Sequence, residues 1–150
     1  MHNEFNLAEY ADTIKEVLAH DGVFRIYPKG TSMMPLIRQK KDSVVLTAPK
    51  FPMSKGDIIF YQRKNGQFVL HRIVKKTGDT YVCCGDNQVQ LEPGIDKSMI
   101  IAVVEAIYRK DKKVDNKNLA YRLYLFVWQF FLIRRIVWKL RRLFGGKKTK

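Results

Sequence analysis

The chain of 150 residues fits one domain, and with 46% hydrophobic residues it has enough apolar side chains for a buried core. This composition excludes an intrinsically disordered chain. The net charge of +14 is uneven: residues 1–108 contain 14 Lys and Arg against 12 Asp and Glu, whereas residues 109–150 contain 14 against 2. The distribution excludes a uniformly basic nucleic-acid-binding domain and predicts a near-neutral body followed by a basic tail.

Residues 1–22 place apolar side chains near helical spacing and end in Asp21-Gly22, which predicts a short amphipathic helix. Residues 23–108 contain brief apolar runs rich in β-forming residues: "VFRIYP", "SVVLTA", "DIIFYQ", "QFVLHRIV", "TYVCC" and "MIIAVVEAIY". Asn65-Gly66 and Gly78-Asp79 are hairpin signals between the third, fourth and fifth runs. We expect a mainly β domain that is compact, mostly antiparallel and closed or half-closed as a barrel.

Residues 109–118 contain few apolar side chains and are interpreted as a polar linker. Residues 119–150 are apolar and basic together. Their longest stretch without a charged residue has 11 residues, too few for a helix that crosses a bilayer, which needs about 20. From residue 134 to residue 144, apolar and basic side chains fall on opposite sides of a helical wheel, as in helices that lie at a membrane surface. The residues expected to meet that surface are Trp128, Arg134, Arg135, Trp138, Arg141 and Arg142.

Two other interpretations of this basic, apolar tail are possible. It could pack as a helical pair against the β domain or another protein, or it could contact nucleic acid. Arg122 and Gln129 interrupt the polar side of the wheel, so a kink or two short helices are expected within the tail.

The segment "GTSMMP" places Ser32 in a loop directly after the first predicted strand. A serine there could be a nucleophile, although serine is also common in loops that contain Gly and Pro. Gly30 permits a sharp turn and a close approach of substrate, and Pro35 stiffens the exit. The residues expected to support the loop are Gly30, Thr31, Met33 and Pro35.

A candidate base and a candidate carboxylate follow later in the chain. His71 lies in the predicted strand "FVLHRIV", and a neutral imidazole can accept the proton of a serine. Asp86, in "CCGDNQ", is either a turn residue or the carboxylate that orients the imidazole. Nucleophile, base and carboxylate would then occur in the order Ser, His, Asp.

Taken together, "GTSMMP", "KGDIIF", "LHRIV" and "CGDN" resemble, in order and spacing, the sequence boxes of the signal peptidase I superfamily of serine proteases, the S24/S26-like peptidases. The resemblance covers about residues 24–108 and implies the β barrel of that superfamily. It implies that Ser32 is the nucleophile, that His71 is the general base, and that Asp86 is the aspartate of the third box. A histidine base is found in the endoplasmic-reticulum, archaeal and sporulation-type members.

The resemblance leaves two roles without a clear residue. Related enzymes often carry a hydroxyl two positions before the nucleophile to help bind the oxyanion, but this chain has Gly30 there. The N–H of Ser32 is then expected to carry most of that stabilisation, and one lost donor costs about 3 kcal/mol. A second acidic residue often follows the third box, but Asp96, ten residues beyond Asp86, is not a clean counterpart.

The expected function is that of a signal-peptidase-type endopeptidase that needs no cofactor or metal and cleaves leader, signal or propeptides after small residues. Because the N-terminus lacks the pattern of a secretory signal and the tail is basic, we expect the chain in the cytoplasm, at the inner face of the membrane. Two alternatives remain: a self-cleaving S24-type protease, and a catalytically silent binding module that docks membrane or nucleic acid through its tail.

Overall fold

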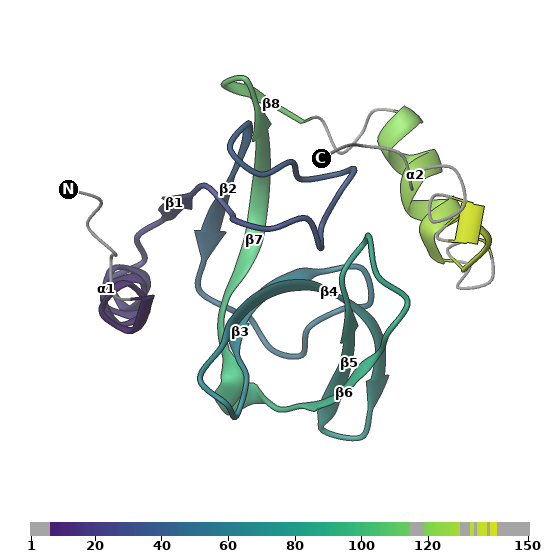
Figure 1. The fold of residues 1–150 in the computed structure, drawn as a ribbon. Coiled ribbons are helices and arrows are strands. Elements are labelled where there is room, and N and C mark those ends of the chain that lie inside the picture. The colour runs from purple at the N-terminus through teal and green to yellow at the C-terminus, as the bar shows by residue number, and fades with distance from the viewer. Residues whose placement is uncertain (1–6, 115–118, 130–132, 134, 138, 141–150) are drawn as a thin grey trace, which may run out of the picture.

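The structure of the protein is a computed structural model that describes residues 7–114, 119–129, 133, 135–137 and 139–140 (Figure 1). One helix comes first, a set of strands follows, and a second helix lies near the C-terminus. The elements are α1 (Leu7–Ala19), β1 (Phe24–Ile26), β2 (Asp42–Thr47), β3 (Ile58–Gln62), β4 (Phe68–Thr77), β5 (Thr80–Cys84), β6 (Glu92–Ile95), a short 3-10 helix (Lys97–Met99), β7 (Ile100–Arg109), β8 (Lys112–Lys113) and α2 (Leu119–Gln129).

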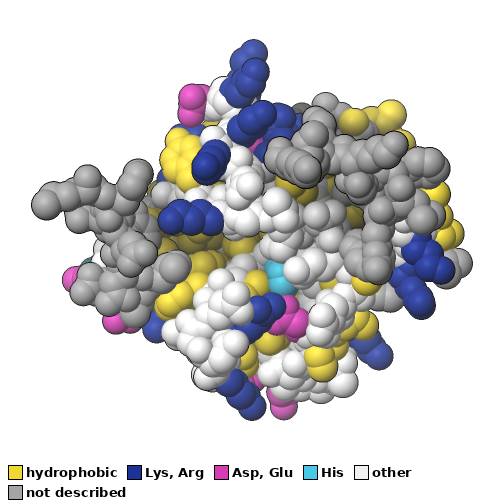
Figure 2. Space-filling model, in the orientation of Figure 1, with side chains coloured by type: hydrophobic (Ala, Val, Ile, Leu, Met, Phe, Trp, Pro, Cys, Tyr) yellow, Lys and Arg dark blue, Asp and Glu magenta, His cyan; other side chains and the backbone are white. Residues whose placement is uncertain are grey.

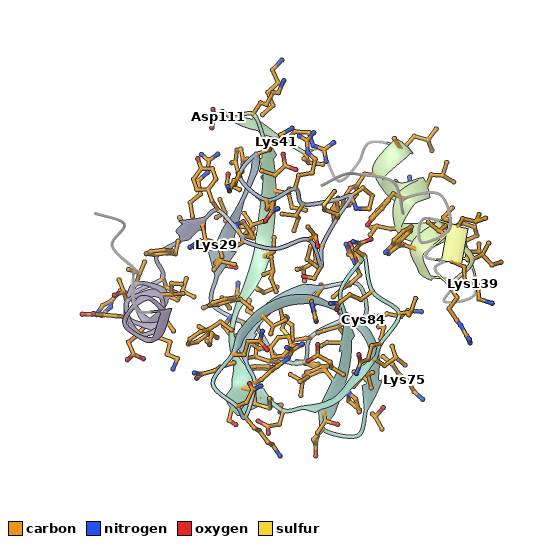
Figure 3. All side chains as sticks on the ribbon, viewed as in Figure 1. Lys29, Lys41, Lys75, Cys84, Asp111 and Lys139 are labelled. Carbon is orange, nitrogen blue, oxygen red and sulfur yellow. The ribbon has the colours of Figure 1, made fainter. Side chains whose placement is uncertain are left out.

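All the strands belong to one eight-stranded sheet, in the order β1-β2-β7-β3-β4-β5-β6, with β8 paired to β7. Every neighbouring pair is antiparallel. Register shifts interrupt the ladders in β2, β3 and β4, and such bulges bend a strand and increase its twist. The sheet therefore curls, and side chains fill the space that β3 to β6 surround (Figures 1 and 3).

The expectation of a mainly β, antiparallel domain is confirmed, whereas closure into a barrel is not. Among the described strands, β1 and β6 stand at opposite ends of the strand order and do not pair, so the sheet stays open. Each of the six predicted runs contains a strand, and both predicted hairpin turns are present. Their glycines, Gly66 and Gly78, have φ values of +85° and +58°, the left-handed conformation that these turns require.

Two strands were not expected from the sequence. β6 contains Pro93 and Gly94, residues that normally interrupt a strand. β8 lies in the segment interpreted as a linker, and it forms because Lys110 and Asp111 adopt left-handed turn conformations that return the chain to β7. The interpretation of residues 109–118 as linker is therefore wrong for its first part.

Helix α1 lies within the predicted helix of residues 1–22, whose first six residues are outside the described part of the chain, and it covers one side of the sheet. It buries Ala11, Ile14 and Leu18, which are spaced three and four residues apart, in a core cluster shared with β2, β3 and β7. The helix ends where predicted, because Asp21 turns into the left-handed region. A second core cluster lies among β3, β4, β5 and β6 and contains Tyr61 and Tyr81.

The tail is helical wherever the structure describes it, at residues 119–129, 133, 135–137 and 139–140. Of the residues expected at a membrane surface, Trp128 is half-buried and Arg135 is exposed. The others, Arg134, Trp138, Arg141 and Arg142, lie outside the described residues, and so does part of the tail in which a kink or two short helices were expected. Within the described part of the chain, we find no helix with the length and apolar character needed to cross a membrane.

Candidate active site

Ser32 lies in a tight turn between β1 and β2. Gly30 has a φ of +88°, and its N–H donates to Oε1 of Gln39 at 3.1 Å. Further along the turn, the N–H of Ile37 donates to the carbonyl of Met33 at 2.9 Å. Apolar side chains from the turn are buried in the core beside α1: Met33, Leu36 and Ile37. These bonds and contacts fix the backbone that carries the half-buried Ser32.

The other two residues expected to support this loop, Thr31 and Pro35, are exposed. The carbonyl of Thr31 accepts a hydrogen bond from the N–H of Met34 at 3.1 Å, and Pro35 follows a cis peptide bond. Both residues therefore shape the turn, while the buried side chains on either side of Pro35 hold it in place.

The turn of Ser32 is joined to the loop that follows β5. The N–H of Asn87 donates to the carbonyl oxygen of Ser32 at 2.7 Å. Gly85 lies at the same junction: a Cβ atom on this residue would lie 2.7 Å from the same carbonyl oxygen and 3.0 Å from Nε2 of His71. Both distances are 3.0 Å or less, so Ser32 O and His71 Nε2 lie no more than about 6 Å apart. Gly85 is thus the point at which the turn of Ser32 and the ring of His71 meet.

His71 is buried in the middle of β4, with a relative exposure of 1%. Its Nδ1 atom lies 3.0 Å from Oε1 of Glu92 and 3.3 Å from the hydroxyl of Tyr61. Because Nδ1 is occupied by these groups, Nε2 is the ring nitrogen on the side of Gly85 and Ser32. This is the orientation in which an imidazole with a carboxylate behind it accepts a proton from a serine.

Glu92 is itself held in position by two further side chains. Arg63 donates to both of its carboxylate oxygens, with Nε 2.7 Å from Oε2. The hydroxyl of Tyr61 donates to Oε2 at 3.0 Å. Bidentate pairing with Arg63 fixes the plane of the carboxylate, and the carboxylate in turn fixes the ring of His71.

Burial sets the protonation states of this group of residues. It lowers the pKa of His71 below its ordinary value, although the nearby carboxylate of Glu92 opposes the shift. Burial alone would raise the pKa of Glu92, but hydrogen bonds from Arg63 and Tyr61 bring that pKa below its usual range. The site therefore holds a neutral imidazole beside an ionised carboxylate near neutral pH, which suits a general base.

The carboxylate of Asp86, which was expected to orient the imidazole, is instead bound by Arg72 and Tyr124. Arg72 donates to both of its oxygens, with Nε 2.9 Å from Oδ1 and Nη2 2.8 Å from Oδ2, and the hydroxyl of Tyr124 donates to Oδ2 at 2.8 Å. The side chains of Arg72 and Asp86 are almost completely buried. The carboxylate in contact with His71 is that of Glu92, so the structure corrects the expected orienting role of Asp86. Asp86 instead anchors the loop that contains Gly85.

Glu92 was missed in the sequence analysis, although a signal was present. It is the acidic residue between Asp86 and Asp96, six positions after the first. Asp96, which was considered as the second acidic residue after the third box, caps the 3-10 helix, with Oδ1 accepting from the N–H of Ser98 at 2.8 Å. Because Pro93 and Gly94 follow Glu92, the sequence indicates a loop rather than the strand that points this carboxylate at His71.

We compared the chain with models of known protein families, with curated proteins and with solved structures, and none of the three comparisons found a match. The function is therefore argued from the geometry of the site.

Proposed function

We propose that the protein is a serine endopeptidase in which Ser32 is the nucleophile, His71 the general base and Glu92 the carboxylate that orients His71. The observation that carries the proposal is the convergence at Gly85 of the Ser32 turn and Nε2 of His71. The opposite ring nitrogen is held by an ionised glutamate. With the hydroxyl of Ser32 turned from this backbone toward Nε2, the hydroxyl, the imidazole and the carboxylate would form the arrangement that activates a serine.

In the proposed reaction, Nε2 of His71 takes the proton of Ser32 as the hydroxyl oxygen attacks a peptide carbonyl. His71, now charged, is stabilised by Glu92 and returns the proton to the leaving amine. An ester between Ser32 and the acyl part of the substrate remains. Water, activated by the same imidazole, then hydrolyses that ester and restores the hydroxyl. The N–H of Ser32 is the proposed donor to the oxyanion.

The proposed substrate is an extended leader, signal or propeptide with small residues before the cleaved bond, as implied by the sequence boxes. The proposed location is the cytoplasmic side of a membrane, and the basic composition of residues 109–150 supports it. The self-cleaving alternative would need a bond such as Cys84–Gly85 to serve as substrate. Both residues are buried, with Cys84 at the end of β5 and Gly85 at the start of the loop that follows it.

The test is labelling of the full chain by a serine-reactive acylating probe. The wild type should become labelled, and Ser32→Ala and His71→Ala should not. Ser54→Ala is the matched control, because Ser54 is exposed and lies outside the site. Equal labelling of Ser32→Ala and wild type would exclude Ser32 as the nucleophile. Folding of each variant is checked by circular dichroism and thermal unfolding.

A catalytically silent binding module, the second alternative, gives a different result in the same experiment. It predicts no labelling of the wild type and no cleavage of peptides with small residues before a candidate bond, while the fold stays intact.

A further inference from the structure

Helix α2 turns its tyrosine side chains toward the β domain. Tyr121 and Tyr124 pack against the core cluster that also contains the turn of Ser32. The rings of Tyr121 and Tyr124 stack with centroids 6.5 Å apart, and those of Tyr124 and Trp128 with centroids 5.2 Å apart. The hydroxyl of Tyr124 donates to Asp86 at 2.8 Å. The amphipathic aromatic residues of the helix are therefore the ones used to attach it to the protein.

The opposite face of α2 exposes large apolar side chains. Leu119, Leu123 and Phe126 have relative exposures of 78%, 58% and 60%. They are spaced four and three residues apart, so they form one stripe, here called the outward face. In a helix that only packs on its own domain, such side chains would line the buried side. Figure 1 shows α2 at the edge of the molecule, and Figure 2 shows hydrophobic side chains exposed on that edge.

Exposed apolar side chains continue in the described residues beyond α2. Ile136 and Leu140 have relative exposures of 51% and 47%, and basic Arg135 and Lys139 beside them are exposed as well. Lys139 points away from the body of the molecule (Figure 3). Six of the ten large hydrophobic side chains that are exposed among the described residues lie in this tail. Apolar exposure is therefore concentrated in one part of the molecule.

The charge of the same segment indicates what covers this surface. Residues 116–150 contain ten Lys and Arg and no Asp or Glu. A second copy of this chain would bring the same positive charge to the interface, which opposes close association. An anionic lipid surface instead offers both acyl chains for the aliphatic side chains and negative head groups for the basic ones.

We propose that the outward face of α2 docks on an anionic lipid surface, with the helix lying in the plane of that surface. Leu119, Leu123 and Phe126 enter the boundary between head groups and acyl chains, and the basic residues of the tail contact the head groups. Because Tyr124 on the inner side of the same helix holds Asp86, docking places the loop of Gly85 beside the membrane. This consequence rests on the proposed peptidase function, whereas lipid binding itself does not.

The test is co-sedimentation of the full chain with vesicles of phosphatidylcholine alone or with 30% phosphatidylglycerol. The wild type should bind the anionic vesicles and lose binding as salt is raised, because salt screens the charges. Leu119→Glu combined with Leu123→Glu should weaken binding roughly 100-fold, because two buried leucines are lost. Val23→Glu combined with Tyr27→Glu is the matched control, since it adds the same charge at exposed apolar residues far from α2 in the sequence.

Three results would overturn the proposal: no binding of the wild type to anionic vesicles, equal binding of wild type and the leucine variant, or a dimer that the leucine variant abolishes while vesicle binding persists. The dimer is measured by light scattering, and it would identify the outward face as a contact between copies. Ser32→Ala should bind vesicles as the wild type does. Failure of the lipid-binding proposal can therefore be told apart from failure of the peptidase proposal.

Discussion

The Nδ1 atom of His71 lies 3.0 Å from Oε1 of Glu92, and the same carboxylate is bound by Arg63 and Tyr61. The imidazole of His71 is thus in contact with a carboxylate whose position is fixed by two other side chains. In a serine peptidase, a group in this position fixes the tautomer of the imidazole and stabilises the positive charge that forms on it. In the proposed mechanism, Glu92 is therefore a positioning residue that acts through His71.

Replacing Glu92 by Gln should lower kcat by roughly 10²- to 10⁴-fold with a smaller change in KM, because the amide stabilises the wrong tautomer and no longer offsets the charge on His71. The variant retains the size of the side chain. The measurement is steady-state cleavage of a fluorogenic peptide, or the rate of acylation by the probe. Glu105→Gln, at an exposed position on β7, is the matched control and should retain the activity of the wild type. A kcat within twofold of the wild type would exclude this role for Glu92.

The activity should rise with pH through a value below the ordinary histidine pKa of about 6.5. His71 must be neutral to accept a proton, and burial lowers its pKa, so the neutral form persists to lower pH than in an exposed histidine. Glu92 raises the pKa of His71, and Glu92→Gln should therefore move the acidic limb to still lower pH. The measurement is kcat/KM from pH 4 to 11. A limb that rises only above pH 9 would point to a lysine base instead.

Replacing Gly85 by Ala should disrupt the site directly. The added methyl group would lie 2.7 Å from the carbonyl of Ser32, closer than real Cβ atoms approach, and 3.0 Å from Nε2 of His71, which is tighter than most real Cβ contacts. The loop or the ring must shift, and misplacement of a catalytic group by about 1 Å costs roughly 10²-fold in rate. Probe labelling should fall by this amount in a protein that still folds.

Gly66→Ala is the control for that substitution, because Gly66 has a φ of +85° but open space around it. It should destabilise the hairpin through backbone strain without moving Ser32 or His71. Suppose that the two glycine variants have the same free energy of unfolding and lose the same fraction of probe labelling. The effect of Gly85→Ala would then come from destabilisation of the fold and not from displacement of Ser32 or His71.

The sequence predicted those parts of the fold that depend on local patterns. The spacing of Ala11, Ile14 and Leu18 follows the helical period, and Gly66 and Gly78 mark turns because other residues rarely adopt their φ values. Strand β6 was missed because its sequence contains Pro93 and Gly94, and its place in the sheet depends on pairing with β5. Local propensity does not encode that pairing.

The residues of the candidate site were likewise predicted only in part from the sequence. Ser32 and His71 were identified from sequence boxes, and the structure brings the turn of the first to the ring of the second at Gly85. The carboxylate was assigned to Asp86, because a motif gives the order of residues and not which oxygen meets which nitrogen. Arg72, the neighbour of His71 in β4, points to the opposite face of the strand and binds Asp86 there. The alternation of side chains along β4 thus decides which carboxylate meets the imidazole.

The ionised carboxylate of Asp42 should stabilise the folded protein at every pH except acidic pH. Its carboxylate is completely buried and accepts hydrogen bonds from the backbone and the guanidinium of Arg38, which ends the turn of Ser32. Burial alone would raise the pKa of Asp42, but the bonds from Arg38 bring it below its ordinary value. The stabilisation is therefore present above about pH 4, the ordinary value, and is lost as pH falls through the lower value of the folded state.

Urea unfolding of wild type and Asp42→Asn from pH 2 to 7 tests this expectation. The free energy of unfolding should be lower for the variant at pH 7, and the difference should shrink below pH 4 as the wild-type carboxylate takes up its proton. Asp12→Asn, on the exposed side of α1, is the control, and its free energy of unfolding should stay close to that of the wild type at every pH. A gap between Asp42→Asn and wild type that stays constant down to pH 2 would contradict the assignment.

The buried pair of Arg72 and Asp86 should be required for the fold, and Tyr124 should be coupled to it. Asp86→Asn leaves the guanidinium of Arg72 buried without its charged partner, which costs about 3–5 kcal/mol. Tyr124→Phe removes one hydrogen bond to a charged group and should cost about 1.5–3 kcal/mol. Because both changes act on the same carboxylate oxygen, the double variant should lose less than the sum of the two. Additive losses in urea unfolding would show that α2 does not support the loop of Gly85 through this bond.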